Sequence, residues 1–222
     1  MPFEALTFPS ERKLTIAWQQ PLWASWGLCT SLLGFHLITA FTVQPVWEAL
    51  VFERTLFFRE RIGGQVAALI EQGEWWRLAS SVSVHVDGVH LILNLIAIIG
   101  LGRVLEPWIG ARRLVGWFCL GGILGSLGSH LAGITISDGA SGGAFALLGA
   151  LVWLGFDSQL QLDSEARWLL TTPVRLLAGV NLLLPIIVPF LDAIGHLVGF
   201  GTGFVLGVIH RRWSIGAAFL DL

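Results

Sequence analysis

The sequence predicts an all-α membrane protein, a bundle of six transmembrane helices with a long external loop between the first and the second. Of its 222 residues, 55% are hydrophobic and only 13% are charged, whereas charged residues make up about a quarter of a typical soluble domain. The 27 glycines, 11 tryptophans and absent tyrosine are typical of closely packed membrane helices with interfacial anchors. We expect residues 1–222 to form a single domain in a lipid bilayer.

Charge and cysteine content exclude several other classes of protein. A formal net charge of -2 excludes a broadly basic nucleic-acid binder. The two cysteines, Cys29 and Cys119, both lie inside apolar runs, which excludes a disulfide scaffold and a cysteine-rich metal site. We expect no cofactor and no metal.

Charge-free stretches define the six spans, because a helix needs about 20 mostly apolar residues to cross a hydrocarbon core of about 30 Å. Leu22 to Val43 lies within an uncharged segment that runs from Lys13 to Glu48. A long polar flank precedes it and no cleavage site follows, so we expect a membrane anchor instead of a signal peptide. The other predicted spans are residues 89–105, 114–136, 141–156, 168–190 and 194–209.

The distribution of lysine and arginine predicts the orientation. With the N-terminus inside, nine of the 13 basic residues lie on the cytoplasmic side, as the positive-inside rule requires. Residues 1–15 then form a cytoplasmic N-terminal segment, and residues 211–222 form a short cytoplasmic tail. The other four arginines lie in the external loop, Gln44 to His85, whose apolar stretch Val46 to Phe58 suits the membrane interface.

Polar residues, which are costly inside a membrane, collect at the start of spans two, four and six. Asp87 is placed to cap the second span, which sets His90 and Asn94 on one helical face. The other two clusters are residues 138–143 and 192–199. Because these three spans enter from the same side, we expect the clusters to meet just below the outer surface.

Spans four and six carry faces that suit close packing. Offsets of 3, 7 and 11 residues return to nearly the same helical direction, and small residues let backbones approach closely. The stripe on span six is His196, Gly199, Gly203 and Gly207, and the matching face of span four is Ser141, Phe145 and Gly149. This packing would bring an imidazole to a hydroxyl, the minimum needed to activate a serine nucleophile.

The position of Ser141 suits acyl transfer. A helix N-terminus presents free N–H groups and a dipole that favours a tetrahedral oxyanion. His196 would remove the Ser141 proton and deliver it to the leaving amine, while His90 and the amide of residue 94 would donate hydrogen bonds to the oxyanion. Asp138 and Asp192 fit better as loop or cap residues, so the residues favour a Ser-His dyad.

Four ordered motifs resemble the rhomboid family of intramembrane serine proteases, over about Gly73 to Gly207. The motifs are E-x-W-R at Glu74, Trp76 and Arg77; H-x-x-x-x-H-x-x-x-N at His85, His90 and Asn94; G-x-S-G at Gly139, Ser141 and Gly142; and H-x-x-G-x-x-x-G at His196, Gly199 and Gly203. The resemblance implies a six-span fold and a peptidase that cleaves transmembrane segments of other membrane proteins. Substrates with a helix-destabilising segment and a small residue before the cut are implied as well.

The resemblance also implies individual roles. Ser141 would be the nucleophile and His196 its base, with His90, Asn94 and the Ser141 backbone N–H as the oxyanion hole. Trp76 and Arg77 would brace the external loop, and the fifth span would form a lateral substrate gate. The supporting positions are His85, Gly139, Gly142, Phe145 and Gly199.

This sequence departs from the family pattern twice. Phe145 stands where tyrosine usually stacks under the catalytic histidine, and Gly195 stands where alanine is usual. The stack survives without its hydroxyl, and the smaller residue at 195 should loosen the start of span six slightly. Neither change removes a reacting group, so we expect activity.

Other interpretations remain open. Ser141 alone reads as a helix cap, and the histidines alone suit structural or metal-binding roles, although no HExxH motif is present. The main rival is an inactive rhomboid-like protein that binds or escorts membrane proteins. A channel or transporter is disfavoured because no polar track reaches the cytoplasmic side. The plan of six spans resembles the bacterial plasma-membrane type; the sequence sets no oligomeric state.

Overall fold

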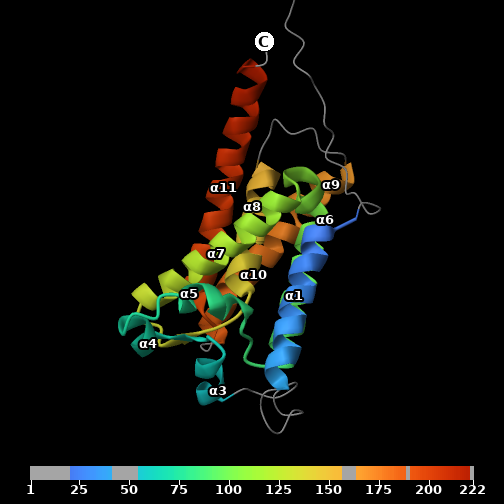
Figure 1. Ribbon diagram of the computed structural model, residues 1–222. Coiled ribbons are helices and arrows are strands. Elements are labelled where there is room, and N and C mark those ends of the chain that lie inside the picture. The colour runs from blue at the N-terminus through green and yellow to red at the C-terminus, as the bar shows by residue number, and fades with distance from the viewer. Residues whose placement is uncertain (1–20, 42–54, 157–163, 189–190, 221–222) are drawn as a thin grey trace, which may run out of the picture.

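The computed structural model describes residues 21–41, 55–156, 164–188 and 191–220. Helices dominate this part of the chain, and one two-stranded sheet accompanies them (Figure 1). The longer helices are α1 (Trp23–Ala40), α6 (Gly88–Ile109), α7 (Ala111–Leu131), α8 (Ser141–Phe156), α10 (Pro173–Ile187) and α11 (Ala193–Leu220). The shorter elements are α3 (Leu56–Arg61), β1 (Gln65–Val66), α4 (Ala67–Glu71), α5 (Arg77–Ser80), the 3₁₀ turn η1 (Ser81–Ser83), β2 (Ile136–Ser137) and α9 (Ser164–Thr171).

The predicted helical membrane architecture is confirmed in its coarse form. Among the described residues, three helices are long and apolar enough to cross a membrane: Gly88–Ile109, Ala111–Leu131 and Ala193–His210. The apolar α8 is shorter, at 16 residues. The count of six spans stays a prediction.

The structure differs from the predicted spans in three places. The fifth span is broken at Thr172, because Pro173 has no N–H to continue α9 and instead starts α10 at its first position. The third ends at Leu131, after which Gly133, with φ of 79°, turns the chain toward β2. Helix α11 runs on to Leu220, through the predicted tail. The predicted segment 1–15 and most of the stretch 46–58 lie outside the described residues.

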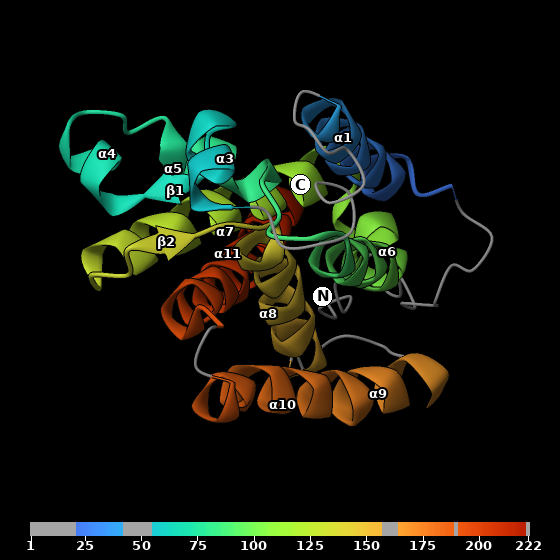
Figure 2. The ribbon, with the colours of Figure 1, turned by 90° about the horizontal axis from the view of Figure 1, so that it is seen from below.

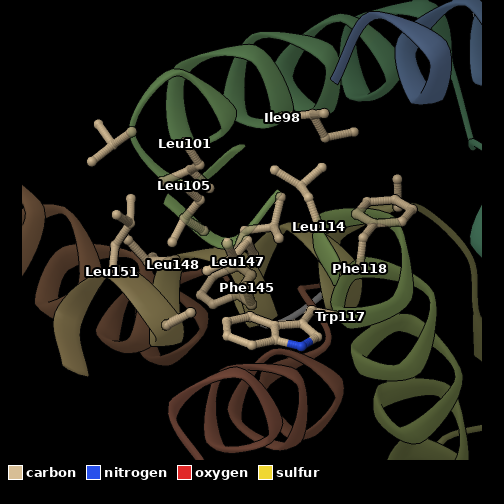
Figure 3. Packing of buried hydrophobic residues seen from close by; sticks show 14 of the residues in the cluster. Ile98, Leu101, Leu105, Leu114, Trp117, Phe118, Phe145, Leu147, Leu148 and Leu151 are labelled. Carbon is tan, nitrogen blue, oxygen red and sulfur yellow. The ribbon is translucent and has the colours of Figure 1, made fainter. Parts of the chain in front are cut away.

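Helix α8 forms the centre of the molecule. Its residues from Gly143 to Val152 are all buried, as expected for a helix that is apolar on every side. Figure 3 shows side chains from α6, α7 and α8 interlocked around this core, among them Leu105, Leu114 and Leu147. Seen from below, α9 and α10 lie end to end on the flank of α8 that faces away from α1 (Figure 2).

Helices α8 and α11 pack backbone to backbone. A Cβ atom at Gly199 would overlap the carbonyl of Gly142, and one at Gly203 would overlap the carbonyl of Ala146. The predicted glycine stripe of α11 therefore does face α8. The closest contacts on α8 fall one residue beyond the predicted positions 141 and 145, because those two side chains face His196 instead.

A buried carboxylate caps α1 at the opposite end of the bundle from Ser141. Glu106, near the end of α6, accepts hydrogen bonds from the Ala24 N–H at 2.7 Å and the Ser25 N–H at 2.9 Å. The Ser25 hydroxyl donates to the same side chain at 2.6 Å. These bonds satisfy amides at the helix start that lack intrahelical partners and tie α1 to α6.

Candidate active site

Ser141 and His196 meet where α8 and α11 begin. The Ser141 Oγ lies 2.9 Å from the His196 Nε2, a hydrogen-bond distance. Ser141 is the first residue of α8, and His196 lies in the first turn of α11. Two helix starts that are 55 residues apart in the chain thus place a hydroxyl against an imidazole.

The surroundings of His196 fix the plane of its ring. The Phe145 ring stacks on the imidazole, with centroids 4.2 Å apart and planes 10° from parallel. For Nε2 to accept the Ser141 proton, Nδ1 must carry the ring hydrogen. That Nδ1 is buried and finds no hydrogen-bond partner among the described residues. The geometry is therefore that of a dyad held by stacking.

His90 lies in the first turn of α6, close to Gly139, and Asn94 follows one turn later. The predicted cap is confirmed, since the Asp87 carboxylate accepts the His90 N–H at 2.6 Å. The His90 ring lies so close to Gly139 that a Cβ there would approach its Cε1 to 2.7 Å, and Gly139 has φ of 130°. The Asn94 amide donates one hydrogen to the His90 carbonyl at 2.9 Å, which leaves its second hydrogen for another acceptor.

His85 contacts the loop that leads into Ser141. Its Nε2 accepts a hydrogen bond of 3.4 Å from the Ala140 N–H, and its Nδ1 lies 3.3 Å from the Ser83 carbonyl. An acceptor at Nε2 and a donor at Nδ1 describe the neutral ring. His85 therefore supports the position of the backbone just before Ser141.

A small polar cavity adjoins the dyad. Four segments that are distant in sequence contribute to it: η1, α7, the loop from β2 to α8, and the start of α11. Its polar side chains are Ser81, Ser126, Ser137, Ser141, Asp192 and His196. Such a cavity gives the hydroxyl at residue 141 a polar environment inside a largely apolar protein.

The chain matches a known family over this region. The model of the Rhomboid domain matches residues 72–213, which include Ser141, His196, His90 and Asn94. This chain belongs to the rhomboid family.

Curated rhomboid proteins align with most of the chain. It is 31% identical over 180 residues to RHOMBOID-like protein 5 of Arabidopsis thaliana. This alignment covers 80% of this chain and 57% of that protein. It is 33% identical over 144 residues to Rhomboid protease GluP of Bacillus subtilis. That alignment covers 64% of this chain and 27% of the relative. The chain thus covers between about a quarter and somewhat over half of the length of these two relatives.

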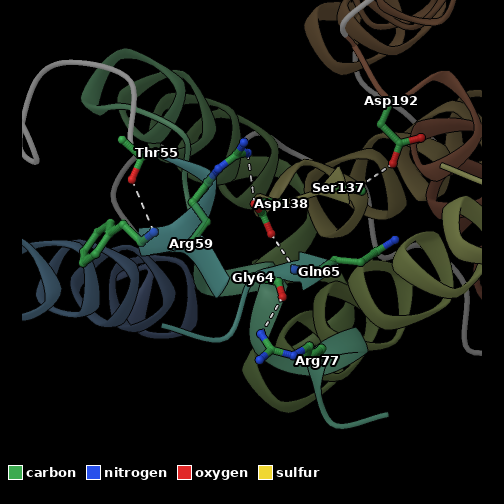
Figure 4. A network of polar contacts seen from close by, with 9 residues as sticks. Thr55, Arg59, Gly64, Gln65, Arg77, Ser137, Asp138 and Asp192 are labelled. Atoms are coloured by element: carbon green, nitrogen blue, oxygen red, sulfur yellow. Dashed lines mark hydrogen bonds and ion pairs between the residues drawn. The ribbon is translucent and has the colours of Figure 1, made fainter. Parts of the chain in front are cut away.

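The segment before α6 is tied to the candidate site of this rhomboid domain through Asp138, three residues before Ser141. Its carboxylate accepts the Gln65 N–H at 2.7 Å and pairs with Arg59 at 3.2 Å (Figure 4). β1 also pairs antiparallel with β2, with Gln65 opposite Ser137. Burial raises the pKa of Asp138 to about 6, although the Gln65 amide and Arg59 both act to lower it.

Arg77 of the E-x-W-R motif holds the same segment from its other side. The buried guanidinium donates to the carbonyls of Glu60 at 2.8 Å and Gly64 at 2.9 Å. It also pairs with Glu74 at 2.8 Å and lies over the Trp76 ring at 4.6 Å. These contacts show how this motif folds the rhomboid loop into a compact unit outside the dyad.

Three features of the site were not predicted from the sequence. They are the β1–β2 pairing, the Asp138–Arg59 ion pair, and the hydrogen bonds from Ser129 and Ser137 to Asp192. Strands of two residues carry no alternation of polar and apolar side chains to detect. Ion pairs between residues 79 positions apart have no local sequence signal either.

Proposed function

We propose that this rhomboid-family chain is a serine endopeptidase that cleaves transmembrane segments of other membrane proteins. The observation that carries the proposal is the 2.9 Å contact between the Ser141 Oγ and the His196 Nε2 at the N-terminus of α8. Rhomboid protease GluP and the putative rhomboid protease YdcA of Bacillus subtilis are among its relatives, which supports the same activity. No cofactor enters the reaction.

The mechanism begins with acylation. His196 takes the Ser141 proton at Nε2 while Oγ attacks the carbonyl carbon of the scissile bond. The negative charge that develops on the carbonyl oxygen is stabilised by the Ser141 N–H and by side-chain donors from His90 and Asn94. The N-terminus of the 16-residue α8 adds a favourable dipole. His196 then gives its proton to the leaving amine.

Deacylation repeats these steps with water. The polar cavity beside the dyad supplies an environment in which water can reach the acyl-enzyme. His196 removes a proton from the water as it attacks the ester carbonyl, and it returns that proton to the Ser141 Oγ. The carboxylic product and the free hydroxyl complete the cycle.

We place the enzyme in a bacterial plasma membrane, with the N-terminus in the cytoplasm and the site toward the outer side. The lysine and arginine distribution supports this orientation. A substrate helix would enter past α10, the helix that flanks α8. A local break in the substrate helix is required, because a helical backbone does not offer its carbonyl to Ser141.

Cleavage of a model transmembrane substrate by the purified protein in detergent tests the proposal. We expect cleavage by the wild type and none by Ser141→Ala, with Ser31→Ala, at an exposed serine of α1, as a matched serine control that retains activity. Cleavage by Ser141→Ala at the wild-type rate would refute the assignment. Substrate binding without cleavage by the folded wild type would favour the rival function, a binding or escort protein.

A further inference from the structure

Asp192 ends the segment before α11 and binds three separate parts of the chain. Its Oδ1 accepts the Gly195 N–H at 2.8 Å, and its Oδ2 accepts the hydroxyls of Ser129, at the end of α7, and Ser137, in β2. Figure 4 shows the contact between Asp192 and Ser137. Both carboxylate oxygens are therefore engaged, and neither binds the His196 Nδ1, which has no described partner.

These contacts set where His196 lies. The Asp192 carbonyl accepts the His196 N–H at 3.1 Å, the first turn of α11. The side chain of Asp192 therefore caps this turn in the way expected of an N-cap residue. It also anchors the turn to α7 and β2. Since the imidazole is one turn from the cap, any movement of the cap moves the ring relative to Ser141.

The glycine at position 195 fits this arrangement. An added Cβ there would overlap the Asp192 carboxylate and would lie 2.6 Å from the Ser129 hydroxyl. The space left by the missing methyl group is thus filled by the polar contacts of Asp192. These hydrogen bonds would counteract the loosening that the smaller residue predicts for the start of span six.

We propose that Asp192 is a positioning residue for the dyad, which holds the first turn of α11 so that the His196 ring faces Ser141. This inference rests on the proposed serine peptidase function. It differs from a third catalytic acid, because the carboxylate makes no hydrogen bond to the imidazole and holds it in place through the helix start. Asp192 and His196 line the same cavity, yet the structure connects them by backbone.

The rate constant for labelling of Ser141 by a fluorophosphonate reports the arrangement of the dyad directly. A displacement of about 1 Å at a reacting group costs about 100-fold in rate, so we expect a loss of about that size in folded Asp192→Ala. Asp192→Asn should recover most of it, because the amide oxygen can still cap Gly195 and the amide NH₂ can donate to a serine hydroxyl. A peptidase assay should show the same loss in kcat with KM little changed.

Glu106→Ala is the matched control for a purely structural effect. Glu106 is a buried carboxylate that also caps a helix start, at the far end of the bundle. Its loss should lower the thermal midpoint without changing the labelling rate of the folded protein. If Asp192→Ala does not fold, the double variant Ser129→Ala/Ser137→Ala removes the anchor while keeping the cap, and we expect about a 10-fold loss.

The outcomes separate this inference from the proposed function. If the wild type is labelled and the folded Asp192→Ala variant, or the double variant, is labelled at the same rate, the positioning role is overturned. The proposed peptidase function then stands. A loss in Asp192→Asn as large as in Asp192→Ala overturns the positioning role too, because the negative charge and not the position would then matter. A folded wild type without labelling overturns both proposals.

Discussion

The contact between α8 and α11 makes Gly199 the most informative position for a single added methyl group. A Cβ at Gly199 would overlap the Gly142 carbonyl oxygen and would lie 3.0 Å from its carbonyl carbon and 3.1 Å from its Cα. Carbon atoms pack best at about 3.5–4.0 Å. Gly199→Ala therefore requires the two helices to separate by about 0.5–1 Å, next to the residue that follows Ser141.

Two effects of known size follow from this separation. Overpacking of a tight contact costs about 1–3 kcal/mol of unfolding free energy. Since His196 lies on α11 and Ser141 on α8, the same shift should lower the labelling rate of Ser141 by up to about 100-fold. The assay is the labelling rate in detergent, measured together with the thermal midpoint.

Gly201→Ala is the control on the same helix. No atom from outside the surrounding turns of α11 lies within 4 Å of a Cβ at Gly201, and alanine favours a helix interior over glycine by about 1 kcal/mol. This variant should be as active as the wild type and at least as stable. Equal activity and stability of Gly199→Ala and Gly201→Ala would refute the packing argument.

Three further predictions concern the surroundings of the dyad. Phe145→Leu should lower the labelling rate about 2- to 10-fold, since a stacked aromatic pair contributes about 0.5–1.5 kcal/mol. Arg77→Ala should lower the unfolding free energy by about 3–6 kcal/mol, because two loop carbonyls lose charged donors worth about 1.5–3 kcal/mol each. The Asp138 proton is held more tightly in the folded protein, with a pKa of about 6, than at the ordinary value of 3.8. The stability of the wild type relative to Asp138→Asn should therefore fall by about 2 kcal/mol as the pH rises from about 4.5 to about 7.

Each of these predictions has its own contrary result. Phe145→Tyr keeps the stack and should label at the wild-type rate; a loss as large as that in the leucine variant would argue against stacking. Wild-type stability of Arg77→Ala would show that the two hydrogen bonds from Nη1 to the loop carbonyls contribute little. A stability advantage of the wild type that grows with pH would show that the Arg59 ion pair outweighs the burial of Asp138.

Local sequence signals predicted the helix starts well and the long-range polar contacts poorly. Asp87 was identifiable as a cap because an acceptor just before an apolar run has one common use, and the glycine stripe of α11 was identifiable from its spacing. The partners of Asp192 and Asp138 were not, because Ser129, Ser137 and Arg59 reach them from other elements of the fold. Pro173 is a signal for a helix break. The apolar run from 168 to 190 is long enough for a whole span, however, and it predicted one unbroken helix.

In the candidate site, too, some features could be predicted from the sequence and others could not. Position at the start of three helices predicted that Ser141, His196 and His90 would lie near one another, and their coordinates agree with that topology. The register of α8 against α11 was predicted one residue off, because the direction of side chains at a tight backbone contact depends on how both helices rotate. The periodicity of a sequence indicates which face of each helix is buried. It does not indicate how one helix is rotated relative to its neighbour.

The central claim is that the hydroxyl of Ser141 is a nucleophile activated by His196. Mass spectrometry of the folded protein after treatment with a fluorophosphonate tests it most directly, since the adduct can be assigned to one residue. We predict a single adduct on Ser141 in the wild type and none in His196→Ala. An unmodified Ser141 in the folded wild type, or equal modification in both proteins, would contradict the account.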